Sequence, residues 1–127
     1  KESVIVLSKP LKYIYEANSA IMKAGAFKSV AARCELKKLH QNSHLYTSDE
    51  YVSNFPGRRF KLTDVLSPNR KELMKLKIHK ANLACRNYPQ KVDVLKKKLK
   101  LKDGGKDYIF ATTLSDGKPK LILCSKA

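Results

Sequence analysis

Few side chains in this sequence have the spacing that catalysis requires. Glu16 stands in YIYEANS at residues 13–19, where two tyrosines and an isoleucine surround its carboxylate. Such a group is either a general acid or base in an apolar pocket, or a structural residue beside a helix start. We favour the structural interpretation, because one acid indicates neither the partner group nor the cleft that catalysis needs.

Two histidines, His40 and His44, have the four-residue spacing of metal ligands on one helix face. The interval contains Asn42 and Ser43, which favour a turn, and no Glu follows His40 as the zinc-protease pattern requires. With no third ligand indicated, we do not expect a metal site.

The cysteines are Cys34, Cys85 and Cys124, an odd number without a paired motif. This pattern argues against a disulfide framework or a cysteine zinc site and favours a reducing, cytoplasmic environment. The sequence also lacks the glycine-rich phosphate loops and the nucleophile elbow. We therefore expect no catalytic centre and no bound cofactor in this chain.

Positive charge dominates the second half of the chain. The sequence holds 27 Lys and Arg against 11 Asp and Glu, a net charge of +16. Residues 58–127 contribute +13 of this, and residues 1–57 contribute +3. Such an excess attracts polyanions, namely RNA, DNA or anionic lipid. The longest apolar run, VIVL, is far shorter than the roughly 20 residues that cross a bilayer, so we expect no membrane association through a span.

The elements expected in the first half are a strand, a helix and two short strands. VIVL at residues 4–7 predicts a strand buried on both faces and ended by a proline. A helix is expected to begin at Asn18 or Ser19 and to run to Cys34, which places Glu16 just ahead of it. Residues 36–52 predict short strands joined by a turn, and Phe-Pro-Gly at 55–57 interrupts the chain.

The second half predicts the order strand, helix, strand, helix, strand, strand. The alternation at 58–66 indicates a half-buried strand with a basic outer face. A first helix is expected to start at Ser67-Pro68 or at Asn69 and to bury Leu73 and Leu76. A second strand follows at 81–88.

The second helix, at 91–101, is expected to bury Val92, Leu95 and Leu99 and to end at Gly104 or Gly105. Residues 107–114 and 118–125 predict a hairpin closed by a type I′ turn at Asp-Gly. The fold class is thus α+β, with a βαβαββ arrangement of helices on a mixed sheet.

Cations of this second half are the candidates for contacts with RNA phosphates. They are Arg58, Arg59 and Lys61, placed on the outer face of the first strand, together with Arg86, Lys91, Lys96, Lys97, Lys98, Lys100 and Lys102. Phosphate contacts of this kind fix the register of an RNA without reading its sequence.

Several stretches together resemble the C-terminal region of a family of bacterial class I S-adenosylmethionine-dependent methyltransferases. They are YIYEANSAIMKAGAFKSVAARC, LHQNSHLYTSD, FPGRRF and the segment from CRNYPQ to LILC. The resemblance implies a ferredoxin-like segment at 1–55 and a THUMP-like domain at 58–127. Where the family has Tyr-Glu-Pro followed by Asn or Asp, this chain has Ala17 in place of the proline, so the resemblance does not require a rigid turn there, although Glu16 and Asn18 are kept.

The resemblance also implies a function. The chain would be a non-catalytic region that binds a transfer or ribosomal RNA and positions it for a methyltransferase domain N-terminal to it, where S-adenosylmethionine would bind. The alternative is a structural module whose basic face docks on that same methyltransferase domain. Fold alone does not decide between them.

Overall fold

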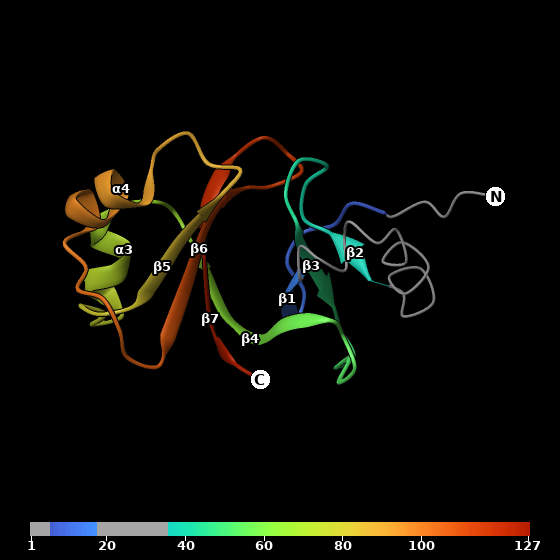
Figure 1. The fold of residues 1–127 in the computed structure, drawn as a ribbon. Helices are drawn as coiled ribbons and strands as arrows, with labels where there is room; N and C mark the ends of the chain where they lie inside the picture. Colours follow the sequence, from blue (N-terminus) through green and yellow to red (C-terminus); the bar gives the residue numbers. More distant parts are fainter. Residues whose placement is uncertain (1–5, 18–35) are drawn as a thin grey trace.

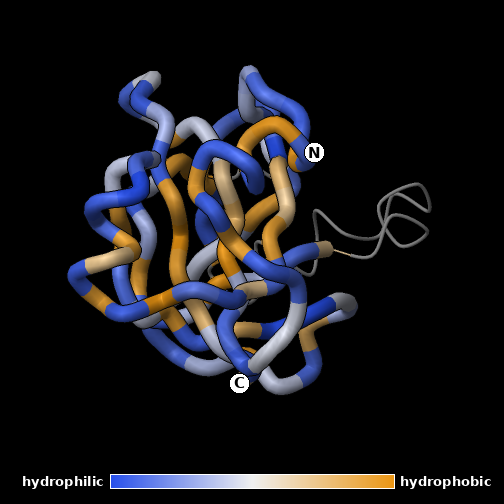
Figure 2. Tube along the Cα trace, turned by 90° about the vertical axis from the view of Figure 1, so that its left-hand side faces the viewer, coloured by the Kyte–Doolittle hydropathy of each residue, from blue (hydrophilic) through white to orange (hydrophobic). Residues whose placement is uncertain are grey.

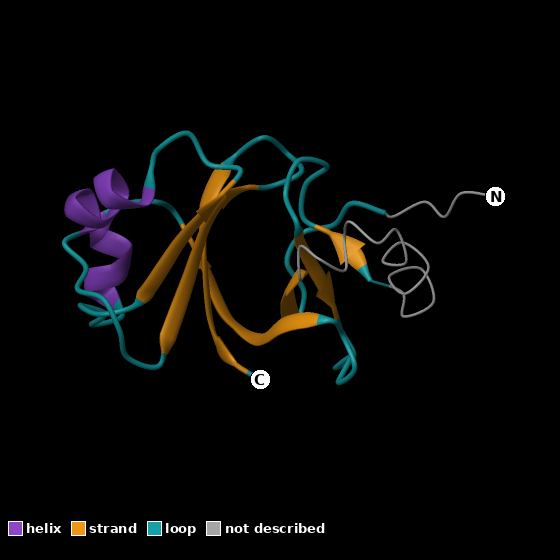
Figure 3. Cartoon of the chain, in the orientation of Figure 1, coloured by secondary structure: helices purple, strands orange, loops and turns teal. Residues whose placement is uncertain are grey.

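The computed structural model describes residues 6–17 and 36–127. Within these residues the chain forms strands β1 (Tyr13–Ala17), β2 (Lys37–Lys38), β3 (Leu45–Ser48), β4 (Gly57–Leu66), β5 (Asn82–Arg86), β6 (Asp107–Thr113) and β7 (Pro119–Lys126), with helices α3 (Arg70–Lys75) and α4 (Val92–Leu99). The predicted α+β class and the strand and helix order of the second half are confirmed. Helix α3 and helix α4 lie together at one end of the molecule, and β1 to β3 lie at the other (Figures 1 and 3).

One sheet contains all seven described strands, in the order β2-β3-β1-β4-β7-β6-β5. Neighbouring strands are antiparallel except β5 and β6, which are parallel and are joined through α4. A parallel pair needs such a crossover, because a short turn cannot return the chain to the same end of the sheet. The sheet is therefore mixed, as predicted.

The long strand β4 belongs to both ends of this sheet. Its first residues pair with β1, Gly57 opposite Ala17, and its later residues pair with β7 across a register shift between Leu62 and Asp64. Glycine is required at position 57, because a Cβ there would overlap the carbonyl oxygen of Glu16. The Phe-Pro-Gly sequence thus interrupts the chain and also allows β4 to approach β1 closely.

Apolar side chains fill both faces of the β5–β6–β7 portion. On one face Leu95 and Leu99 of α4 pack with Ile109 and Leu121. On the opposite face Phe110 and Ile122 pack with side chains from β1, β3 and β4, including Ile14, Leu45 and Phe60. Figure 2 shows hydrophobic stretches along the central strands and hydrophilic stretches in the peripheral turns. Helices and the β1–β3 region thus lie on opposite sides of these strands.

Helix α3 begins at the second of its two predicted starts. Asn69 is the N-cap, and its side-chain oxygen accepts a hydrogen bond from the backbone of Glu72 at 3.1 Å. Leu73 is buried as predicted. The predicted burial of Leu76 is wrong: the helix ends there, and its side chain is 43% exposed.

Helix α4 buries Leu95 and Leu99 as its periodicity predicted, but the predicted burial of Val92 is wrong, because this first residue of the helix is only partly buried. Its predicted glycine cap is wrong, because Lys100 adopts the left-handed conformation at the C-cap, with φ of 54°. Gly104 and Gly105 also have positive φ but lie beyond the helix end. The glycine pair therefore correctly predicted a turn, but the helix ends several residues before it.

The hairpin of β6 and β7 is confirmed, but its turn is not type I′. A type I′ turn needs positive φ at both central residues, and within the loop only Gly117 has it. The Gly117 backbone N–H bonds to the Leu114 carbonyl, and the Leu114 N–H bonds to the Lys118 carbonyl. The connection is consequently a three-residue loop with glycine in the left-handed position.

In the first half, the turn predicted at residues 41–43 is confirmed between β2 and β3. The buried strand predicted at 4–7 is wrong where it can be judged: Val6 is 60% and Leu7 is 42% exposed, and Leu7 forms an isolated bridge with Lys38. Residues 4 and 5 and the helix expected from Asn18 or Ser19 lie outside the described residues. Among the helices that the structure describes, none is long and apolar enough to cross a membrane.

Candidate nucleic-acid interface

The ten predicted RNA-binding cations fall into three groups. Arg58 and Arg86 both bind the Glu16 carboxylate. Arg59 and Lys61 lie on the face of β4 opposite Arg58. The remaining six lysines belong to α4 and the residues that flank it. The placement of Arg58 on the outer face is wrong. Its guanidinium carbon lies 5.3 Å from the Phe60 ring centroid, on the inner face of the sheet.

Glu16 joins the two ends of the molecule. Its Oε1 accepts hydrogen bonds from Nε and Nη2 of Arg58, at 3.0 and 2.6 Å, and its Oε2 accepts one from Nε of Arg86 at 2.6 Å. Glu16 lies in β1, Arg58 in β4 and Arg86 at the end of β5. Paired ions with this short geometry are charge-assisted hydrogen bonds, which hold all three side chains in fixed positions.

The protonation of Glu16 follows from these contacts. Partial burial alone would raise its pKa, but the hydrogen bonds and positive charges of Arg58 and Arg86 outweigh burial and lower the pKa from its ordinary value of 4.5. The carboxylate is therefore ionised at neutral pH and has no proton to donate. This arrangement supports the structural interpretation: among the described residues the partners of Glu16 are two arginines, and the expected helix start lies outside them.

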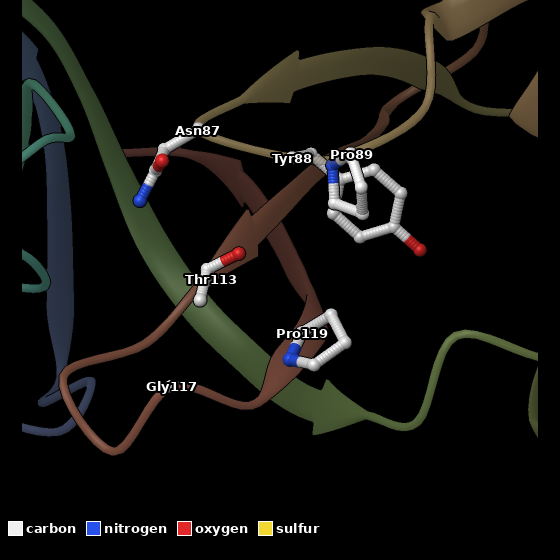
Figure 4. A pocket seen from close by; sticks show the side chains of 6 residues that line it. All are labelled: Asn87, Tyr88, Pro89, Thr113, Gly117 and Pro119. Carbon is white, nitrogen blue, oxygen red and sulfur yellow. The ribbon is translucent and has the colours of Figure 1, made fainter.

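Arg86 also lines an open pocket of about 650 Å³ with Lys91, the N-cap residue of α4. A neighbouring pocket of about 540 Å³, shown in Figure 4, lies where β5 and β6 end and is lined by Asn87, Tyr88, Pro89, Thr113, Gly117 and Pro119. Asn87 Nδ2 lies 3.0 Å from Nδ1 of His40, a second contact between the two ends of the molecule. The lining of the larger pocket is mixed, because Asp93 and the apolar Leu83 and Val92 accompany its two cations.

The lysines of α4 form the third group. Lys96 makes an ion pair with Asp103 at 2.9 Å, whereas Lys97, Lys98, Lys100 and Lys102 are exposed and, within the described residues, make no ion pair. Because α4 covers the face of the sheet opposite β1, these lysines lie away from Arg58 and Glu16. Contact of any of the ten cations with RNA stays a prediction.

The outer face of β4 carries aromatic residues that the sequence analysis missed. Arg59 Nε donates to the Tyr51 hydroxyl at 3.1 Å, and Lys61 is the cross-strand partner of Tyr13. Tyr51 and Tyr13 lie in contact, with ring centroids 5.2 Å apart. The only sequence signal was a tyrosine among polar residues in a loop, which also fits an ordinary surface position.

Other chemistry finds little support in the described residues. They contain no group of three or more His, Cys, Asp or Glu placed to hold a metal ion. Burial raises the pKa of the Cys124 thiol to about 12, so this cysteine is an inert core residue. Cys85 is partly buried, and its pKa is raised as well. Cys34 lies outside the described residues.

Comparisons with known proteins agree with this architecture. A family model described as a ferredoxin-like domain matches residues 13–56, and one described as THUMP domain-like matches residues 57–126. The crystal structure of a "putative methyltransferase" from Porphyromonas gingivalis W83 is similar, with 43% sequence identity and a TM-score of 0.85. The match covers 98% of this chain and 32% of that one, so this chain spans about a third of the length of its relative. A search of curated proteins finds no match.

Proposed function

This chain belongs to the THUMP domain-like family, and from this premise we propose that it is the RNA-binding, non-catalytic accessory region of an S-adenosylmethionine-dependent methyltransferase. The similar Porphyromonas gingivalis protein is described as a "putative methyltransferase" and is about three times as long. In this proposal a separate methyltransferase domain binds the methyl donor and transfers the methyl group. The RNA, transfer or ribosomal, is held by this chain.

The observation that carries the proposal is the exposed positive charge of the THUMP-like region. Residues 58–127 hold 19 Lys and Arg against 6 Asp and Glu. Four of the α4-region lysines are exposed without an ion-pair partner among the described residues. Each cation that neutralises a phosphate releases a bound counterion, so affinity for RNA gains from every such contact and depends on salt.

The second candidate is docking of this chain on the methyltransferase domain of the same protein. The docking candidate is favoured by two solvent-exposed apolar side chains on the helices, Met74 at 50% and Val94 at 52% exposure. Contact with another protein would remove these apolar side chains from water. The helices would then meet a protein surface, and RNA would not bind to them.

A salt titration distinguishes the two candidates. The variant carries Gln in place of Lys96, Lys97, Lys98, Lys100 and Lys102, and its affinity for bulk transfer RNA is compared with that of the unaltered protein. Successive helical residues are turned about 100° apart, so we expect two or three of the five to contact phosphates. The slope of log affinity against log salt should flatten by roughly 2, equally for unrelated RNA sequences.

The matched control removes the same charge elsewhere. It carries Gln at Lys71, Lys75, Lys77, Lys80 and Lys106, all of them exposed. Circular dichroism verifies folding of both variants, since Gln is a good helix former and the buried leucines of α4 are kept. An equal change in both slopes would remove α4 as the RNA surface. Absence of binding to transfer RNA and to heparin at low salt would favour docking on protein.

A further inference from the structure

Tyr51 is a solvent-exposed aromatic residue held in a fixed position. Its side chain is 43% exposed, its ring contacts Tyr13 at a tilt of 50°, and its hydroxyl accepts a hydrogen bond from Arg59. Arg59 also donates to the Phe55 carbonyl at 3.4 Å, which limits its own movement. An exposed tyrosine ordinarily samples several rotamers, and the contacts of its ring and hydroxyl favour the observed rotamer of Tyr51.

The loop that carries Tyr51 is anchored from within the core. Tyr15 is fully buried, and its hydroxyl lies 2.8 Å from the Ser48 hydroxyl. The same oxygen accepts a hydrogen bond from the Val52 backbone at 3.0 Å, and the Ser48 hydroxyl bonds to the Glu50 carbonyl. These bonds flank Tyr51 on both sides in the chain. These hydrogen bonds of the loop thus add to the contacts of the ring and hydroxyl in positioning Tyr51.

An open pocket of about 640 Å³ lies beside this ring pair. Tyr13 forms part of its wall, and Lys12 and Lys61 place two cations on its lining, opposed by Asp49. Its volume falls in the range of about 300–1,000 Å³ that holds small ligands. The surface therefore joins aromatic rings, a pocket wide enough for a nucleobase, and cations for the adjoining phosphates.

We propose that Tyr13, Tyr51, Arg59 and Lys61, here named the tyrosine–cation surface, bind an unpaired nucleobase of a single-stranded RNA segment. The base would stack on Tyr51, and Arg59 and Lys61 would contact the phosphates on either side of it. This inference rests on the proposed RNA-binding function and locates a contact that the α4 lysines do not provide. It lies on the face of β4 opposite the Glu16 ion pairs.

Charge and ring geometry select this ligand. An A-form duplex keeps its bases stacked inside the helix, so it offers no base face to an exposed tyrosine, whereas loops and single strands do. Stacking on aromatic side chains tolerates any sequence, because every base has a π face. The net charge of +16 favours a polyanion over a peptide for the same pocket.

Two substitutions of Tyr51 test the proposal with the 127-residue chain. Tyr51→Leu keeps apolar volume but removes the ring, and Tyr51→Phe keeps the ring but loses the hydroxyl. Affinities are measured by fluorescence anisotropy at low salt for a ten-nucleotide single strand and for a duplex of equal length. We expect Tyr51→Leu to weaken single-strand binding by about tenfold, Tyr51→Phe by less than about threefold, and neither to change duplex binding.

A spectroscopic measurement makes the result independent of the folding of Tyr51→Leu. A single strand with 2-aminopurine loses fluorescence when this base stacks on a ring, and the unaltered protein should produce that loss. Three results would overturn the tyrosine–cation surface while RNA binding stands. They are equal single-strand affinities of the unaltered protein and Tyr51→Leu, an equal loss of affinity of Tyr51→Leu for single strand and duplex, and 2-aminopurine whose fluorescence the unaltered protein does not quench. Failure of the unaltered protein to bind any RNA would overturn both proposals.

Discussion

At the scale of single residues, Glu16 has a structural role that its neighbours in sequence did not reveal. Its carboxylate is 15% exposed and bonds to two arginines that are 42 and 70 residues away in the chain. Arg58 and Arg86 were predicted as phosphate ligands, yet part of their hydrogen-bonding capacity is used by this carboxylate. The same pairing holds β1, β4 and β5 in a common arrangement, so the cost of removing it should appear in stability.

We predict that Glu16→Gln lowers the free energy of unfolding by about 1–2 kcal/mol. This magnitude lies between that of an exposed ion pair and that of a buried charged hydrogen bond, as the half-exposed arginines suggest. Urea unfolding at pH 7 measures it. Glu50→Gln is the matched control, because Glu50 is exposed and forms no ion pair within the described residues. A change no larger than that of the control would contradict the structural role.

The same pair of proteins predicts a pH dependence. The pKa of Glu16 is lowered in the folded state, so its stabilisation is present in full above the ordinary pKa of 4.5. It is lost as the pH falls below 4.5 and through the lower folded-state pKa. The difference in unfolding free energy between the unaltered protein and Glu16→Gln should therefore shrink toward acid pH. A difference that stays constant from pH 7 to pH 3 would assign the stabilisation to something other than the carboxylate charge.

At the scale of elements, the end of α4 carries a measurable strain. Lys100 adopts φ of 54°, a conformation that costs an L-residue with a side chain about 1–2 kcal/mol. Lys100→Gly should therefore stabilise the protein by about 0.5–1 kcal/mol, after allowance for the greater freedom of glycine in the unfolded chain. Lys98→Gly, within the helix, should destabilise it by about 1 kcal/mol. Thermal unfolding measures the change in stability of both variants. Changes of the same sign would refute the assignment of Lys100 as the C-cap.

Elements with strong local signals could be predicted from the sequence. The apolar spacing of α4, the alternation in β4 and the Asp-Gly turn identify elements through contacts that are close in sequence. Errors occurred at the ends of elements, as with Leu76, which the apolar pattern includes in the helix but which is its exposed C-cap residue. The ion pairs of Glu16 could not be predicted, because the local sequence contains no information on which strands become neighbours in the sheet. Tyr51 was missed for the same reason.

At the scale of the whole molecule, the two matched family regions share one core. Ile14 and Leu45, from the ferredoxin-like match, pack in the same cluster as Phe60 and Phe110, from the THUMP-like match. Strand β4 pairs with β1 at one end and with β7 at the other, so the backbone hydrogen bonds are continuous as well. A boundary between family descriptions at residues 56 and 57 is thus not a boundary between separately packed units.

This continuity predicts that the two regions unfold together. Ile14 is fully buried, and Ile14→Ala should cost about 2–4 kcal/mol through lost burial and the cavity left behind. Hydrogen exchange measured by mass spectrometry should then show β3 and β6 losing protection by the same factor, although Ile14 lies in β1. Val94→Ala is the control, because Val94 is 52% exposed and its loss should change stability by less than about 0.5 kcal/mol. If β3 lost protection while β6 kept it, the ferredoxin-like region would be an independent unit, and the shared cluster would stabilise it without coupling it to the THUMP-like strands.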